Sequence, residues 1–220
     1  VVPPAVTFVP SAWGGTTPTI VPASMIAGAV TDATITFTTG NPWTADGKLI
    51  IEIPDTFTNV AAASHLTVTS GVDGTVSVAQ TGTSTVLAST LKTAGGPWIV
   101  TFTRGGDGTT VATGTQVVIV LTDVMTNQQH EGSSGIFPLF KTTLSDGTTA
   151  IDESSAEADA SGADTPAVIF TPSAWGGTTP TIVPVSLIAG AVTDATVTFT
   201  TGNPWTADGK LIFEVPDTFT

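Results

Sequence analysis

Catalytic chemistry in this chain would have to start from few side chains, because it has two histidines and no cysteine. His130 lies in the sequence HEGSSG, close to Ser133 and Ser134, whereas His65 stands apart. This pattern differs from the G-x-S-x-G motif of hydrolases, and no strand–turn–helix pattern surrounds it. Two separate histidines also fall short of a zinc site. We therefore expect a polar loop around His130 and no enzymatic activity within these residues.

Carboxylates are plentiful, with 18 acidic residues against five basic ones and a net charge of −13. No spacing singles out a glycosidase pair. One acidic run, residues 151–167, contains no base, and its carboxylates could bind calcium at a hinge. These weak calcium candidates are Asp152, Glu153, Glu157, Asp159 and Asp164. The alternative is a solvated acidic linker. No other cofactor is expected, and the negative charge makes nucleic acid and anionic membranes poor partners.

Tryptophan offers a binding hypothesis, since its rings stack on sugars and each one here lies near glycine or proline. The candidates for sugar or inter-repeat contacts are Trp13, Trp43, Trp98, Trp175 and Trp205. The alternative is that these rings cap the ends of a hydrophobic core.

Threonine is abundant, whereas lysine and glutamate are scarce, which suits an extracellular surface better than a cytosolic one. Stretches rich in Thr, Ser and Pro are candidate sites for O-linked glycans. The candidates are Thr16, Thr17, Thr19, Thr81, Thr83, Thr85, Thr178, Thr179 and Thr181. Ordinary β-strand threonines are the alternative.

Strict alternation of apolar and polar residues runs through the chain, and helical periodicity is missing. Ala33, Ile35 and Phe37 alternate with threonines, and alternation recurs around residues 48–53, 66–68 and 76–78. Residues 99–103 and the apolar run 117–121 predict central strands, and residues 136–144 predict a late strand broken by Pro138. Asp-Gly and Gly-Asn-Pro turns separate these runs. The pattern predicts an all-β fold, an antiparallel immunoglobulin-like (Ig-like) β-sandwich.

The chain also repeats itself. Residues 8–58 recur as residues 170–220, at an offset of 162 residues and with 45 of 51 positions identical. We therefore expect a complete repeat at residues 1–162, the first third of a second copy at 163–220, and a linker near 151–167. A third of a sandwich would leave strand edges open. We expect the chain to be a window on a longer array, with the missing strands supplied by further sequence or by a neighbouring chain.

Most differences between the copies are apolar exchanges. Ile35, Ile51 and Ile53 are replaced by Val197, Phe213 and Val215, all on faces assigned to the core. Cores tolerate such repacking, so the drift supports these assignments.

The repeat resembles a family of extracellular proteins. It has a Thr-rich strand, a turn ending in Asp-Gly, a strand closing on Ile-Pro-Asp-Thr-Phe, and a late strand introduced by Gly-Thr, as in AGAVTDATITFTTGNPWTADGKLIIEIPDTFT and GTQVVIVLTDVMTN. It is similar to the tandem β-sandwich repeats of large surface and fibril proteins of stramenopile algae and some bacteria.

The resemblance implies a structural, O-glycosylated subunit of an extracellular filament, whose partners are further copies of itself and covalent glycans, without membrane insertion. An adhesin or carbohydrate-binding stalk is the alternative. A secreted hydrolase would need a catalytic domain outside these residues.

Overall fold

The computed structural model describes residues 12–54, 56–57, 59–60, 66–81, 98–135, 137, 139–155, 167–177, 179–188, 190–205 and 209–215. These residues form antiparallel β-sheets, which confirms the predicted all-β class. They contain no helix that could cross a membrane. The chain divides into two compact units, residues 1–171 and 172–220. The division falls after Thr171, later than the boundary that the sequence repeat suggests.

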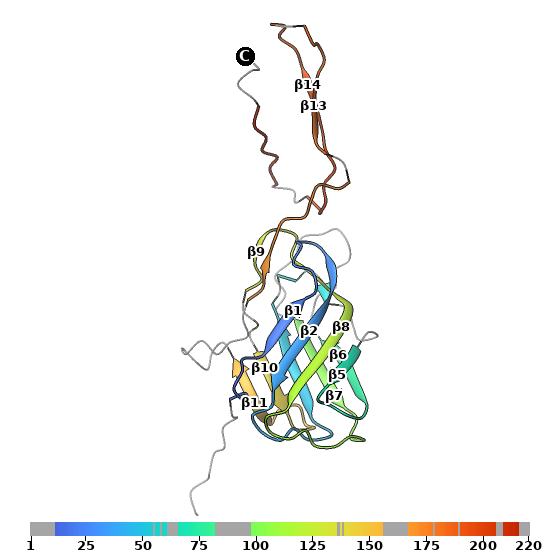
Figure 1. Cartoon of the computed structure of the whole chain (residues 1–220), viewed down its shortest axis with the longest axis vertical. Helices are drawn as coiled ribbons and strands as arrows, with labels where there is room; N and C mark the ends of the chain where they lie inside the picture. The colour runs from blue at the N-terminus through green and yellow to red at the C-terminus, as the bar shows by residue number, and fades with distance from the viewer. Residues whose placement is uncertain are drawn as a thin grey trace, which may run out of the picture. The chain divides into compact units, whose positions relative to one another are not determined.

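The first unit contains two five-stranded sheets (Figure 1). In the first sheet, the order is β1-β2-β8-β4, and β5 also pairs with β8. Its strands are β1 (Thr19–Pro22), β2 (Val30–Thr38), β4 (Asn59–Val60), β5 (Leu66–Ser70) and β8 (Gln116–Thr126). The long β8 is the centre of this sheet because it pairs with three other strands.

The second sheet has the order β11-β10-β3-β7-β6, with every pair antiparallel. Its strands are β3 (Lys48–Ile53), β6 (Val76–Thr81), β7 (Trp98–Arg104), β10 (Leu139–Thr143) and β11 (Ala150–Ser155). Strand β11 overlaps the expected acidic linker, so the hinge cannot begin at residue 151.

The two sheets enclose one hydrophobic core. Ala33, Ile35 and Phe37 of β2 are buried, and the threonines between them are partly exposed. Leu49 and Ile51 of β3 are buried in the same cluster. Burial of each such side chain contributes roughly 1.5–3 kcal/mol. The faces predicted from alternation are therefore confirmed.

A short third pairing completes the first unit. Strand β9 (Gly132–Ser133) pairs antiparallel with β12 (Ile169–Phe170), and Phe170 is buried in the main core. This pairing explains why the unit ends after Thr171: the sequence repeat has already restarted, but the first core still needs Phe170.

The second unit contains one hairpin among its described residues, formed by β13 (Thr181–Pro184) and β14 (Ala195–Thr198). Thr181 pairs with Thr198 as Thr19 pairs with Thr36 in the first unit, so the register is the same in both copies. Local sequence therefore suffices to set this register.

Candidate functional site

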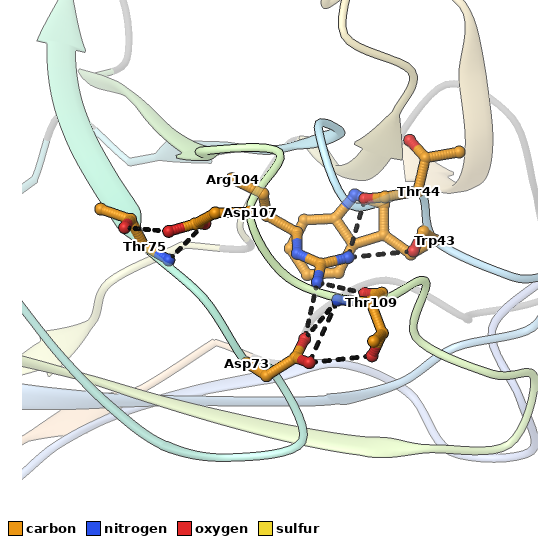
Figure 2. Close-up of polar contacts among 7 residues, drawn as sticks. All are labelled: Trp43, Thr44, Asp73, Thr75, Arg104, Asp107 and Thr109. Carbon is orange, nitrogen blue, oxygen red and sulfur yellow. Dashed lines mark hydrogen bonds and ion pairs between the residues drawn. The ribbon is translucent and has the colours of Figure 1, made fainter.

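The densest polar cluster described surrounds Arg104, the last residue of β7, whose side chain is buried (Figure 2). Its Nη1 donates to the carbonyls of Trp43 at 3.0 Å and Thr44 at 2.7 Å. Its Nη2 donates to the carbonyl of Thr109 at 2.5 Å and to Asp73 Oδ1 at 3.3 Å. One guanidinium thus joins three separate loops.

The ring of Trp43 forms one wall of the cluster. The Arg104 guanidinium carbon lies 5.2 Å from its ring centroid, close enough for a cation–π interaction. Residue 47 must be glycine here, because a Cβ atom would come within 2.5 Å of Trp43 Nε1 and 2.6 Å of the Thr143 carbonyl oxygen. The sequence Asn-Pro-Trp-Thr-Ala-Asp-Gly therefore places the ring beneath the arginine.

Two Asp-Gly-Thr turns exchange hydrogen bonds across the cluster. Asp107 accepts from the Thr75 amide at 2.8 Å and its hydroxyl at 2.6 Å. In return, Asp73 accepts from the Thr109 amide at 2.9 Å and its hydroxyl at 2.9 Å. Each aspartate therefore holds the threonine of the other turn, as Figure 2 shows.

The middle glycines make this exchange possible. Gly74 has φ +77°, in the left-handed region that other residues rarely adopt, and a Cβ there would lie 2.6 Å from Asp107 Oδ1. A Cβ on Gly108 would lie 2.5 Å from the Asp73 carbonyl oxygen. A side chain at either position would push the two turns apart.

The electrostatics favour the ionised forms of the aspartates. Hydrogen bonds from the Thr109 amide and hydroxyl lower the pKa of Asp73, and those from the Thr75 hydroxyl and amide lower the pKa of Asp107. Burial lowers the pKa of Arg104, a shift that Asp73, Asp46 and Asp107 oppose. An arginine in such a site still carries its charge at neutral pH.

This arrangement stabilises loops and offers little for a reaction. An open groove of about 390 Å³ lies beside it, lined by Gly71, Val72, Asp73, Thr109, Thr110, Val111, Ala112 and Thr115. Asp73 is the one ionisable residue in that lining, and its carboxylate already accepts bonds from Thr109. A nucleophile paired with a base does not occur in that set.

The calcium candidates are placed only in part. Asp152 is buried within β11, and its Oδ2 accepts from the amides of Gly40 at 3.0 Å and Asn41 at 3.3 Å. Its position in a hinge was therefore wrong: it ties β11 to the loop after β2. Glu153 is partly exposed on the same strand and pairs with Lys141 across the ladder. Glu157, Asp159 and Asp164 lie outside the described residues. Within the described part, no group of three His, Asp or Glu could hold a metal.

The tryptophans differ between the units. In the first unit Trp43 and Trp98 are buried, and Trp13 packs edge-on against Phe37 and Phe140. The buried rings of Trp43 and Trp98 have no free face for a sugar, and the partly buried Trp13 packs against the same core, so these positions fit the core-capping interpretation. Trp175 and Trp205 of the second unit are about half exposed, at 49% and 48%.

The glycan candidates are mostly on the surface where they are described. Thr16, Thr17, Thr179 and Thr181 are exposed, whereas Thr19 is half-buried in β1. Thr81 is the last residue of β6, and its side chain lies outside the description, as do Thr83, Thr85 and Thr178 entirely. Four of the nine candidates are therefore accessible to a modifying enzyme.

The HEGSSG segment has a structural role. His130 is exposed, with Nδ1 2.8 Å from the Glu131 carbonyl oxygen, and His65 lies outside the described residues. Ser134 is buried, and its hydroxyl accepts from the Val168 amide at 2.9 Å. The serine that superficially suggested a hydrolase instead anchors β12.

Comparison with known proteins returned no relative: the chain matches no protein-family model and no curated protein.

The Arg104 cluster is not predicted when Asp-Gly pairs are interpreted only as turn signals. The usable signal was two Asp-Gly-Thr tripeptides, at residues 73–75 and 107–109, with the second one following a strand that ends on arginine. An arginine ending an apolar strand in a chain with five basic residues has few interpretations other than a buried partner for acids.

Proposed function

We propose that this chain is a structural subunit of an extracellular filament built from tandem Ig-like β-sandwich repeats. One observation carries the proposal: the two copies share a sequence but differ in burial. Ile51 is 0% exposed and its counterpart Phe213 is 51% exposed; Trp43 is 0% exposed and Trp205 is 48% exposed. The second copy thus has a core face without the strands that cover it in the first copy.

Those covering strands are identified by the first unit. Strand β8 pairs with β2, and β7 and β10 flank β3. All three come from the part of the repeat that lies beyond the first 58 residues. Repetition of one sequence along a chain is typical of arrays, in which the same strands recur in every copy.

The chemistry of the described residues supports a structural role as well. Arg104, Asp73 and Asp107 bond to one another's loops, and Asp152 and Ser134 bond to backbone amides. These groups stabilise the unit, and we propose no catalytic activity for them.

We also propose that the surface carries O-linked glycans, with Thr16, Thr17, Thr179 and Thr181 as the accessible acceptors. A hydroxyl-rich surface with few lysines lacks the residue that most often protects exposed strand edges, and glycans would shield those edges. Extracellular localisation belongs to the same proposal.

Electron cryomicroscopy of native material tests the filament directly. We expect filaments whose axial repeat matches one unit of 162 residues, with extra density on some of the exposed threonines. Discrete monomers in native material would overturn the filament. Filaments with bare threonines would overturn the glycan part alone.

A further inference from the structure

Strand β12 belongs by sequence to the second repeat but by structure to the first unit. The Ser134 amide donates to the Val168 carbonyl at 2.8 Å, and the Val168 amide donates back to the Ser134 hydroxyl at 2.9 Å. Further along, the Thr171 amide donates to the Met25 carbonyl at 2.9 Å, and the Ala27 amide donates to the Thr171 carbonyl at 2.8 Å. These bonds clamp residues 168–171 at both ends.

The segment buries alternate side chains. Val168 is 7% exposed and Phe170 is 2% exposed, whereas Ile169 between them is 63% exposed. The ring of Phe170 meets that of Phe57 edge-on, with centroids 5.6 Å apart. We call the groups that receive this segment the β12 seat: Met25, Ala27, Phe57, Gly132, Ser133 and Ser134.

The same segment occurs once more in the chain. Residues 6–9 are Val-Thr-Phe-Val, and residues 168–171 are Val-Ile-Phe-Thr. The two residues that the seat buries, valine and phenylalanine, are the same in both. The two that differ stand at positions 169 and 171, which are exposed. The two apolar side chains that the seat buries are therefore present in residues 6–9.

We propose that residues 6–9 are a second docking strand, and that they occupy the β12 seat of a second copy of the repeat unit. This inference rests on the proposed function, and names the contact that joins one unit to the unit before it. The seat within the same unit is already filled by residues 168–171, so residues 6–9 must find theirs on another copy. The contact is strand addition, in which backbone bonds give affinity and two apolar pockets give specificity.

A tethered strand has an effective concentration in the millimolar range, so residues 168–171 will exclude a competing strand from their own seat. The test therefore empties the seat in one copy. The acceptor is the full chain with Val168→Asp, Phe170→Asp and Ser133→Cys, and the donor is the full chain with Thr7→Cys. Because the natural chain has no cysteine, the two introduced thiols are the only ones present.

We expect a disulfide between positions 7 and 133. Residue 169 is the Cα partner of Ser133, and residue 7 is its counterpart in the docking strand. Partners across an antiparallel ladder lie about 4.5–5.5 Å apart, within the range of a disulfide. A donor carrying Val9→Cys instead is the matched control, because it keeps Val6 and Phe8. Its counterpart Thr171 bonds to Met25 and Ala27 and not to Ser133, so we expect at least about tenfold less product.

A chain carrying both Ser133→Cys and Ile169→Cys is the positive control, and it should close an intramolecular disulfide. If it does so while position 7 reacts no better than position 9, the proposal is overturned. If the cross-link forms but the native material is monomeric, the contact at the β12 seat is supported and the filament proposal is overturned. If native filaments are seen but the cross-link does not form, the filament proposal is supported and the contact is overturned.

A milder acceptor takes the place of the emptied one if the latter fails to fold. Phe170→Ala with Ser133→Cys keeps the backbone bonds of β12 and weakens its packing. We expect Phe170→Ala to lower the unfolding midpoint of the first unit by about 10 °C, and an added peptide of residues 4–11 to restore part of it. The same peptide with Phe8→Ala should restore nothing. Equal effects of the two peptides would contradict the proposal.

Discussion

At the scale of single residues, Arg104 is a buried side chain at the centre of a polar cluster in the first unit. It reaches three loops with four hydrogen bonds and lies against the ring of Trp43. Its partners are mainly backbone carbonyls, and those of Trp43 and Thr44 also accept from the amides of Val111 and Gly47. The planar fork of arginine suits this task, and the point charge of lysine does not.

We expect Arg104→Met to destabilise the chain by about 3 kcal/mol, because the four hydrogen bonds of the buried guanidinium are lost, including the ion pair with Asp73. Arg104→Lys should recover only part of this loss. The measurement is the free energy of unfolding from urea titration. Lys141→Met, at a partly exposed position of β10, is the control for lost positive charge. A value for Arg104→Met within about 0.5 kcal/mol of the natural chain would show that the cluster is unimportant.

The two Asp-Gly-Thr turns make stability depend on pH. Hydrogen bonds from the threonines hold the pKa of Asp73 and Asp107 below the ordinary value of 3.8. The pKa of each aspartate is lower in the folded state than in the unfolded state. The contribution of the two aspartates to stability is therefore complete above the unfolded-state pKa and is lost as the pH falls through the folded-state pKa. We expect the unfolding midpoint to decrease when the pH is lowered below about 4. In the double variant Asp73→Asn, Asp107→Asn, we expect this decrease to be smaller.

The control for that pH series is Glu131→Gln, which removes one negative charge at an exposed site. It separates a specific effect of the turns from a general effect of net charge. If the unfolding midpoint of the double variant decreases with pH as steeply as that of the natural chain, the acid sensitivity does not come from the two turns.

At the scale of elements, the apolar pattern predicted most strands of both sheets, including the edge strand β6, but missed the edge strands β1 and β11. Strand β2 was predicted from regular alternation, whereas β8 was predicted from the continuous apolar run 117–121. Strand β11 was assigned to a linker because its inward residue is Asp152, a carboxylate where alternation expects an apolar side chain. The amides of Gly40 and Asn41, more than a hundred residues away, make that position tolerable.

Strands β1 and β12 were missed for different reasons. Strand β1 has the sequence Thr-Ile-Val-Pro, which was assigned to a stretch of glycan acceptors. Strand β12 is two residues long and exists because a distant partner, β9, is present. Neither pattern extends over enough residues to establish a period, so contacts distant in sequence decide both.

We expect Asp152→Ala to destabilise the first unit by about 1–3 kcal/mol in buffer that contains a calcium chelator, because two amides lose their acceptor. The reference is Glu153→Ala on the same strand, expected within about 0.5 kcal/mol of the natural chain. Urea titration with and without calcium measures both. Destabilisation that appears only when calcium is present would support a metal site instead of the backbone contacts.

At the scale of the whole molecule, the two copies of the repeat can be compared directly. Nearly the same sequence stands in two settings, covered in the first unit and open in the second. The hairpin register is the same in both, so it depends on local sequence. Burial differs, so it depends on the strands that cover the hairpin.

We expect Ile51→Asp to abolish the cooperative unfolding transition of the first unit, because it buries a charge without a partner. Phe213→Asp, the same change in the second copy, should leave that transition within about 0.5 kcal/mol. Circular dichroism of the purified full chain on heating measures both. Equal effects would mean that the second copy buries this position in solution.

The placement of β12 also decides how the chain would yield to a mechanical load. A pull on Pro172 acts first on Thr171, which is held by Met25 and Ala27, and then on Phe170. Strand β12 can detach while both five-stranded sheets keep their pairing. Loss of β12 under load is therefore a local opening of the first unit, which breaks the bonds at residues 168 and 171 and exposes Phe170.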